Sequence, residues 1–157
     1  VRLGVDVGSV RVGVAACDPD GILATPLVTL RRGGGDVADL VALAADREAV
    51  EIVVGLPTTL RGEEGTAATA ATRYARALAR RVGCPVRLVD ERLTTVGAQR
   101  ELRAGGVDSR RGRTVVDQVA AAMILQAALD AERRTGVAPG RVVPPHTGDG
   151  DEAEGER

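Results

Sequence analysis

The sequence lacks several residue types and is poor in others. Its 157 residues include no tryptophan or phenylalanine, one tyrosine, one histidine and two cysteines. Cys17 and Cys84 form no CxxC pair, which excludes a disulfide framework and a cysteine zinc site. The longest apolar run, residues 119–125, is far shorter than the roughly 20 residues of a membrane span. No basic and apolar leader opens the sequence, so we expect a cytoplasmic protein that makes no use of a membrane.

Length and composition indicate one folded domain. A mass of 16.2 kDa is the size of one ordinary core, which excludes an enzyme with separate cofactor and substrate domains. Charged residues make up 27% and hydrophobic residues 44%, the balance of a soluble protein. Near the end the composition turns to proline, glycine and acids. We therefore expect a domain over residues 1–138 and a disordered tail over residues 139–157.

Arginine supplies every basic side chain and is unevenly distributed. The formal net charge of -1 argues against a uniformly basic nucleic-acid binder. However, residues 73–113 carry eleven arginines against four acids, and residues 149–157 carry five acids against one arginine. Guanidinium groups suit phosphate because they are planar and permanently charged. The basic segment is therefore either a set of helix faces in solvent or a surface for a polyphosphate backbone.

The first 30 residues predict three consecutive antiparallel strands. Apolar residues alternate with small or polar ones over residues 1–7 and again over residues 10–16, the period of a strand with one face on a core. The turn formers Gly8 and Ser9 join these two runs into a hairpin. Residues 22–30 follow a second turn and form the third strand.

The rest of the sequence alternates between helices and strands. Helices are expected over residues 36–44, 66–82, 94–103 and 114–134, and strands over residues 52–55 and 86–89. This order predicts an α/β fold with a five-stranded mixed sheet, antiparallel at one edge and parallel at the other, flanked by helices.

Three acidic residues stand where packing alone does not explain them. Asp6 lies inside the first strand, where aspartate is disfavoured, and Gly4 and Gly8 leave open space beside it. Asp117 lies on the apolar side of the last helix, so it needs an arginine, hydrogen bonds or a metal ion as a partner. Glu91 follows the fifth strand, at the edge where open α/β sheets place their sites. A surface aspartate, a structural ion pair and an ordinary acid after a strand are the alternative interpretations.

Together, the three acids predict a divalent metal site. Carboxylates that converge repel one another unless a cation neutralises them, and oxygen ligands of this kind suit Mg²⁺ or Mn²⁺. Ions held in this way activate water and stabilise the leaving oxygen in phosphoryl chemistry. The arginine-rich segment then holds a polyphosphate backbone across the site.

Four motifs occur in order along the chain: GVDVGSVRVGVA at residues 4–15, VGLP at 54–57, DERLTT at 90–95 and DQVAA at 117–121. Together they resemble the motifs of the YqgF family, a bacterial group of Holliday junction resolvases and ribosomal RNA precursor nucleases with an RNase H-like fold. The resemblance implies a metal-dependent nuclease whose catalytic and metal-binding acids are Asp6, Glu91 and Asp117. Because the motifs match only three acids, one or two bound ions are both compatible with them.

The resemblance also implies substrate-binding roles for further residues. Arg11 matches the arginine of the first motif, where it either reaches a phosphate or lies at the surface without a partner. Thr94 matches a threonine of the third motif, where it either binds substrate or caps a helix. Three arginines stand where many relatives carry a lysine, and arginine can clamp phosphate there but cannot donate a proton. These three are Arg110, Arg111 and Arg113.

The sequence therefore predicts a hydrolase that cleaves phosphodiester bonds with Mg²⁺ or Mn²⁺. By resemblance, its substrate is either the 5′ end of pre-16S ribosomal RNA, which we favour, or a branched DNA junction, whose two symmetric nicks demand a homodimer. With Tyr74 as the only aromatic residue, base stacking contributes little to recognition. Two other interpretations are an ATP-binding domain related to actin-like ATPases, which need two such domains, and a non-catalytic nucleic-acid-binding or transcription-associated module.

Overall fold

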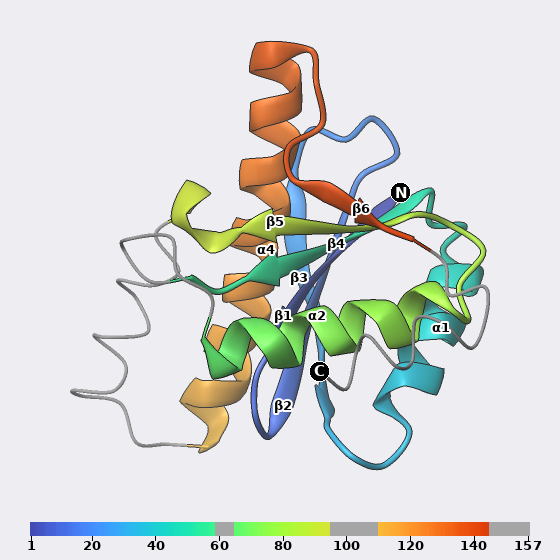
Figure 1. Ribbon diagram of the computed structural model, residues 1–157, viewed down its shortest axis with the longest axis vertical. Coiled ribbons are helices and arrows are strands. Elements are labelled where there is room, and N and C mark those ends of the chain that lie inside the picture. The colour runs from blue at the N-terminus through green and yellow to red at the C-terminus, as the bar shows by residue number, and fades with distance from the viewer. Residues whose placement is uncertain (59–64, 95–109, 145–157) are drawn as a thin grey trace.

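The computed structural model describes residues 1–58, 65–94 and 110–144, without the side chains of residues 110–115. Six strands form one mixed sheet in the order β3-β2-β1-β4-β5-β6 (Figure 1). Strands β1, β2 and β3 are antiparallel neighbours, β1, β4 and β5 run parallel, and β6 is antiparallel to β5. The strands are β1 Arg2–Val7, β2 Arg11–Cys17, β3 Ala24–Arg31, β4 Glu51–Leu56, β5 Val86–Asp90 and β6 Arg141–Val143.

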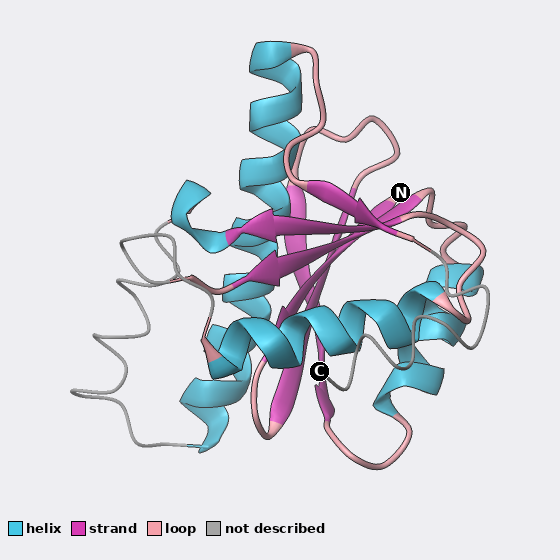
Figure 2. Ribbon diagram, in the orientation of Figure 1, coloured by secondary structure: helices cyan, strands magenta, loops and turns pink. Residues whose placement is uncertain are grey.

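The helices lie on both faces of this sheet. Within the described residues they are α1 Asp36–Asp46, α2 Thr66–Ala79, the short 3₁₀ helix η1 Glu91–Leu93 and α4 Arg110–Thr135. Helices α1 and α2 lie on one face of the sheet, and α4 crosses the other (Figure 2). Among these described helices, none combines the length and the apolar character needed to cross a bilayer.

Large aliphatic side chains fill the space between the sheet and helices α1 and α2. Because side chains alternate along a strand, Leu3 and Val5 of β1 point to this face. They meet Leu40 of α1 and Leu78 of α2, and all four are fully buried. Burying a side chain of this size contributes about 1.5–3 kcal/mol, so this face supplies much of the stability of the scaffold.

One acid belongs to this core. Asp36 is buried, and its carboxylate accepts hydrogen bonds from the Tyr74 hydroxyl at 2.8 Å and from the Gly33 amide at 3.0 Å. Burial raises the pKa of Asp36, but these bonds and the charge of Arg32 outweigh it and leave the pKa below its usual value. Arg32 also lies 5.6 Å from the centre of the Tyr74 ring and donates to the Gly8 carbonyl. The cluster thus ties α1 and α2 to the turn between β1 and β2.

On the other face, α4 lies directly on the sheet. A Cβ atom at Gly13 of β2 would overlap the backbone oxygen of Asp117. A Cβ atom at Gly55 of β4 would come 2.5 Å from Cδ1 of Ile124, which is closer than carbon atoms approach. At Gly13 only glycine leaves room for the backbone of the helix, whereas at Gly55 the end of the Ile124 side chain would have to move.

The open space expected at Gly4 beside Asp6 is not there. A Cβ atom at Gly4 would come 2.7 Å from both the backbone oxygen of Ala121 and Cβ of Leu125. The small residue is therefore required by the close approach of α4. A Cβ atom at Gly8 would likewise come 2.7 Å from the backbone oxygen of Arg11, so the prediction of open space is wrong at both positions.

The sheet has six strands, whereas the sequence predicted five. The additional strand β6 lies in the segment 139–157, which was expected to be a disordered tail. Val143 pairs with Val86 and is 5% exposed, so β6 covers the edge of β5 that would otherwise present unpaired backbone groups. Helix α4 begins four residues earlier than expected, at Arg110. Apart from Thr94, the helix expected over 94–103 lies outside the described residues, and so do residues 145–157 of the expected tail.

Candidate active site

Asp6 is a buried acid on the α4 face of β1, with 3% of its surface exposed. It pairs across the antiparallel ladder with Gly13 of β2. On the other side Val5 pairs with Val54, which places Gly55 of β4 next to Asp6 on the same face. Glycines thus flank Asp6 on both neighbouring strands, where α4 packs against Gly13 and Glu91 lies over Gly55. The burial of Asp6 shows that the surface aspartate considered from the sequence is wrong.

Asp117 is brought to the same place by α4. Its backbone oxygen lies over Gly13, the residue that pairs with Asp6. Its side chain is 13% exposed, and Oδ2 accepts a hydrogen bond from Nε of Arg11 at 3.0 Å. An arginine is one of the partners that the sequence allowed for this acid. The apolar residues three, four, seven and eleven positions after Asp117, which lie on its side of the helix, are all buried: Ala120, Ala121, Ile124 and Ala128.

Glu91 follows β5 directly and begins η1. It is 7% exposed, and its Oε1 lies 3.1 Å from the position that a Cβ atom of Gly55 would take. The side chain thus turns back over β4. Because Gly55 is the neighbour of Asp6 across the sheet, Glu91 lies over the strand position beside Asp6.

Asp90 fixes the turn that carries Glu91. Its Oδ1 accepts hydrogen bonds from the Arg92 amide at 2.8 Å and from the Thr58 hydroxyl at 3.0 Å. The Arg92 guanidinium also binds this carboxylate and, as the largest influence, holds the pKa of Asp90 below its usual value against the opposing effect of burial. In the sequence Asp90 stood out only as the neighbour of Glu91. The sequence signal for this capping role is an acid directly before a short helix.

The three acids share one face and one end of the sheet. Strands β1 and β5 both run parallel to β4, so Asp6 and Glu91 lie where these strands end, and α4 adds Asp117 there. Their carboxylate oxygens are the hard donors that Mg²⁺ and Mn²⁺ prefer. Nevertheless, no group of three or more His, Cys, Asp or Glu side chains in the described part of the chain is arranged to hold a metal ion. Among the described side chains, the guanidinium of Arg11 forms an ion pair with Asp117.

The other candidates from the sequence fall into two groups. Arg11 is not a surface arginine without a partner, because its guanidinium forms an ion pair with Asp117. The Thr94 hydroxyl donates to the Glu91 carbonyl at 2.8 Å at the end of η1. The rest of the helix that Thr94 was expected to cap lies outside the described residues. The structure describes the backbone but not the side chains of the remaining candidates, Arg110, Arg111 and Arg113.

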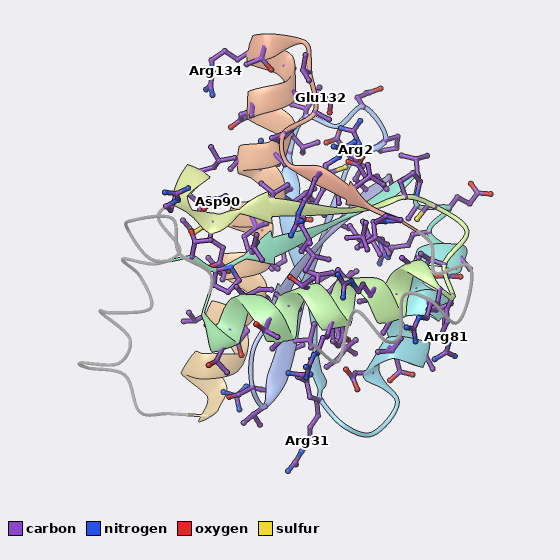
Figure 3. All side chains as sticks on the ribbon, viewed as in Figure 1. Arg2, Arg31, Arg81, Asp90, Glu132 and Arg134 are labelled. Carbon is purple, nitrogen blue, oxygen red and sulfur yellow. The ribbon has the colours of Figure 1, made fainter. Side chains whose placement is uncertain are left out.

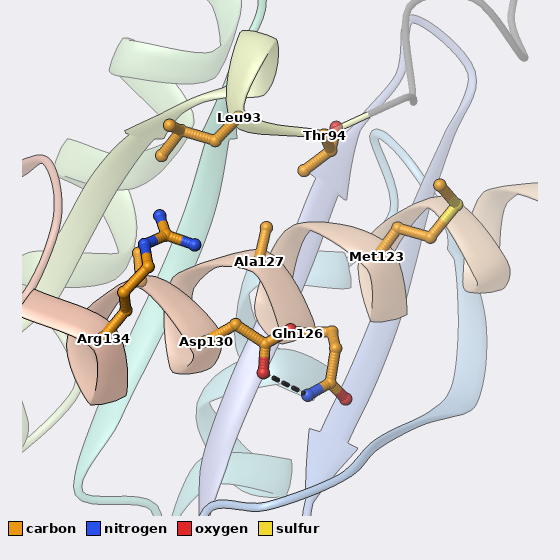
Figure 4. A pocket seen from close by; sticks show the side chains of 8 residues that line it. Leu93, Thr94, Met123, Gln126, Ala127, Asp130 and Arg134 are labelled. Atoms are coloured by element: carbon orange, nitrogen blue, oxygen red, sulfur yellow. Dashed lines mark hydrogen bonds between the residues drawn. The ribbon is translucent and has the colours of Figure 1, made fainter.

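A pocket of about 350 Å³ lies between η1 and the side of α4 that faces it (Figure 4). Thr94 and Leu93 line it from η1, and the Arg134 side chain reaches toward them from α4. Asp130 accepts a hydrogen bond from Gln126 at 3.1 Å beside it. None of the three acids lines this pocket, and among the residues that line it Thr94 is the one named as a candidate from the sequence.

Residues 1–131 match the RuvX family, which is described as Holliday junction resolvase. The chain belongs to this family. RuvX and YqgF are names of the same family, so the resemblance to the YqgF family seen in the four sequence motifs is confirmed.

Three bacterial relatives carry the name "Putative pre-16S rRNA nuclease". The protein of Kineococcus radiotolerans is 60% identical to this chain, and the alignment covers 91% of this chain and 78% of the relative. The protein of Thermobifida fusca is 54% identical, with 91% of this chain and 95% of the relative covered. The protein of Streptomyces coelicolor is also 54% identical, with 90% and 87% covered.

Among solved structures, RuvC of Thermus thermophilus in complex with a Holliday junction substrate is similar to this chain. The TM-score is 0.55 at 18% identity, and the match covers 89% of this chain and 98% of RuvC. At this identity the likeness concerns the fold. It confirms the predicted α/β fold of the RNase H-like class, with six strands in place of five.

Proposed function

We propose that this RuvX-family protein is a nuclease that uses Mg²⁺ or Mn²⁺ to mature the 5′ end of pre-16S ribosomal RNA in the cytoplasm. The names of its relatives, at 54–60% identity over most of the chain, support the substrate. The observation that carries the proposal is the placement of Asp6, Glu91 and Asp117. They come from distant parts of the sequence to one face and one end of the sheet.

In this proposal the three acids hold the metal. Asp6 and Glu91 offer buried oxygens from the ends of rigid strands, and Asp117 offers oxygens from the helix above them. Carboxylates buried close together need a positive charge among them, because burial and mutual repulsion both disfavour the charged form. A divalent ion bound here supplies an activated water and neutralises charge on the leaving oxygen.

We assign the substrate backbone to arginines at the rim of the site. Arg11 sits beside Asp117 with 27% of its side chain exposed, so its guanidinium is within reach of a phosphate that arrives from solvent. Arg110, Arg111 and Arg113 precede Asp117 in the sequence, and we propose that they extend this contact along the backbone.

Resolution of four-way DNA junctions is the second candidate function. The family is described by this activity, and RuvC, whose fold this chain shares, has been solved with a Holliday junction substrate. Two symmetric nicks in a junction require a two-fold dimer. A monomer that cleaves RNA would therefore favour the first candidate, and a dimer that cleaves junctions the second.

A cleavage assay on both substrates tests the proposal. The substrates are an RNA that spans the 5′ end of pre-16S rRNA and a four-way DNA junction, each with Mn²⁺, with Mg²⁺ and with chelator. We expect metal-dependent cleavage of the RNA that falls about a thousandfold in Asp6→Asn, since several kcal/mol of charge stabilisation are lost. Asp46→Asn is the control, because Asp46 is exposed at the end of α1 on the opposite face.

Three other outcomes of the assay would each contradict part of the proposal. Cleavage that persists in chelator or in Asp6→Asn would overturn the metal mechanism. Cleavage of the junction alone would establish the second candidate. Nucleic-acid binding without any cleavage would indicate the non-catalytic module considered from the sequence.

A further inference from the structure

The guanidinium of Arg11 is bound to the carboxylate of Asp117, which is one of the three proposed metal ligands. Nε of Arg11 lies 3.0 Å from Oδ2 of Asp117. Arg11 stands two residues before Gly13 on β2 and so shares the α4 face with it, next to Asp6. A guanidinium and a divalent cation compete for the same oxygen and repel each other at short distance. While this ion pair lasts, Asp117 is therefore a poor ligand for a metal.

Arg31 places a second cation beside Arg11. The two residues are opposite each other in the ladder between β2 and β3, so their side chains share a face. Arg31 is exposed and extends away from the body of the molecule (Figure 3). Its side chain makes no hydrogen bond and no ion pair with the described residues. Like charges directly opposite each other destabilise a strand pair, and an anion bound between them removes this cost.

The ion pair is accessible from its arginine side. The side chain of Arg11 is 27% exposed, twice the 13% of Asp117. A phosphate can therefore meet the guanidinium without displacing α4. Ion pairs that are open to water are weak, whereas a phosphate bound by two guanidinium groups gains several charge-assisted hydrogen bonds. A phosphate at Arg11 and Arg31 is thus a strong competitor for Asp117.

We propose that Arg11 and Arg31 form a phosphate-binding site for the substrate backbone, and that its occupation moves Arg11 from Asp117 to the phosphate. The released Asp117 then binds the divalent ion together with Asp6 and Glu91. This inference rests on the proposed nuclease function and adds an order of binding to it. Nucleic acid binds first, and the metal ion is held tightly only afterwards. The coupling is reciprocal, because linkage requires that each ligand strengthens the other by the same factor.

Mn²⁺ affinity measured by electron paramagnetic resonance of the free ion tests the exchange without any cleavage. In the absence of nucleic acid, Arg11→Gln is expected to bind Mn²⁺ at least about fivefold more tightly than the unmodified full-length protein. The matched control is Arg31→Gln, which removes the same charge from the same face but no bond to Asp117. Its Mn²⁺ affinity should change less than about twofold. Equal tightening in both variants would reveal a plain charge effect and overturn the exchange.

RNA binding in chelator provides the second measurement, with the pre-16S RNA fragment as the probe. Asp117→Asn frees Arg11 for phosphate and should bind the RNA at least about fivefold more tightly, whereas Asp130→Asn, another acid of α4, should change binding less than about twofold. Arg11→Gln and Arg31→Gln should each weaken binding and lower the salt dependence by about one ion. RNA affinity that is unchanged in Asp117→Asn would contradict the proposal.

The two proposals fail in different ways. Protein that binds no Mn²⁺ and cleaves neither substrate would sink the proposed function. Protein that cleaves with Mn²⁺, but in which Arg11→Gln leaves the Mn²⁺ affinity unchanged while circular dichroism shows a folded chain, would sink the exchange alone.

Discussion

The two faces of the sheet are built from different residues. Under α1 and α2, large aliphatic side chains such as Leu3 and Leu78 are fully buried and fill the space. Under α4, glycines such as Gly13 and Gly55 bring the helix against the strands. Because successive residues of a strand point to opposite faces, Val5 can serve the core while Asp6 serves the candidate site. The α4 face also has an aliphatic cluster of its own, which includes Val53, Ile124 and Leu125. The comparison teaches that the pleat of the strands adds the candidate site to only one of two buried faces.

Each face also buries acidic groups, and they differ in their surroundings. Asp36, under α1 and α2, is one acid with a tyrosine hydroxyl and a backbone amide as hydrogen-bond donors. On the α4 face, Asp6, Glu91 and Asp117 lie together at one end of the sheet, with Arg11 against the last of them. A structural role is sufficient for Asp36, whereas the proposed function assigns a shared cation to the three acids of the α4 face.

Leu78→Ala on the α2 side should cause the largest loss of stability. The side chain is fully buried, and its removal leaves a cavity, which costs about 2–5 kcal/mol in the free energy of unfolding. Cleavage per folded molecule should stay unchanged. Urea unfolding and an assay at low temperature check both parts, with the volume-conserving Leu78→Met as the control. If cleavage fell as steeply as stability, the separation of the two faces would be broken.

Gly13→Ala should lose both stability and activity. The new Cβ atom collides with the backbone of α4 at Asp117, and such overpacking costs about 1–3 kcal/mol. The displaced Asp117 should lower cleavage about a hundredfold, the effect of an ångström of misplacement. Thermal unfolding and cleavage rates provide the test. Gly34→Ala is the matched control, because nothing lies within 4 Å of its Cβ position. Wild-type cleavage by the Gly13 variant would refute the close approach.

Tyr74→Phe should cost about 1.5 kcal/mol near neutral pH, the contribution of a hydrogen bond to a charged group. Burial, and then the neighbouring Asp36, raise the pKa of Tyr74, so the phenol stays protonated and donates. The pKa of Asp36 in the folded state lies below its usual 3.8. Its stabilising contribution is therefore present above that value and lost as the pH falls through the folded-state pKa.

The destabilisation by Tyr74→Phe should consequently shrink when urea unfolding is repeated at a pH of about 2 instead of about 7. A difference between the two proteins that is independent of pH would contradict the assigned role of Asp36. Cleavage near neutral pH should be retained, because this cluster lies on the face opposite the three acids.

Gly55→Ala should have the smallest effect on stability, under about 1 kcal/mol, because the nearest atom is the flexible end of the Ile124 side chain. Its Cβ atom also presses on Oε1 of Glu91, so cleavage should fall about tenfold. Gly83→Ala, with nothing within 4 Å, is the control for the rate measurement. Full activity of the Gly55 variant would show that the position of Glu91 is not critical.

The strands and main helices were predictable from the sequence because their signals are local. Alternation marked β1 and β2, and helical spacing put Ala120 and Ile124 on the buried side of α4. The short strand β6 was missed, since its few residues form a strand only against the edge of β5. The contact of α4 with Gly4 and the pair of Arg11 with Asp117 join residues more than a hundred positions apart. No local pattern selects such partners.

Mn²⁺ soaked into crystals together with a substrate RNA, and located by anomalous scattering, is the most direct test of the central claim. The account predicts an anomalous peak within about 2.5 Å of carboxylate oxygens of Asp6, Glu91 and Asp117, with Arg11 turned to a phosphate. A peak elsewhere, in a protein whose cleavage depends on Mn²⁺, would contradict it.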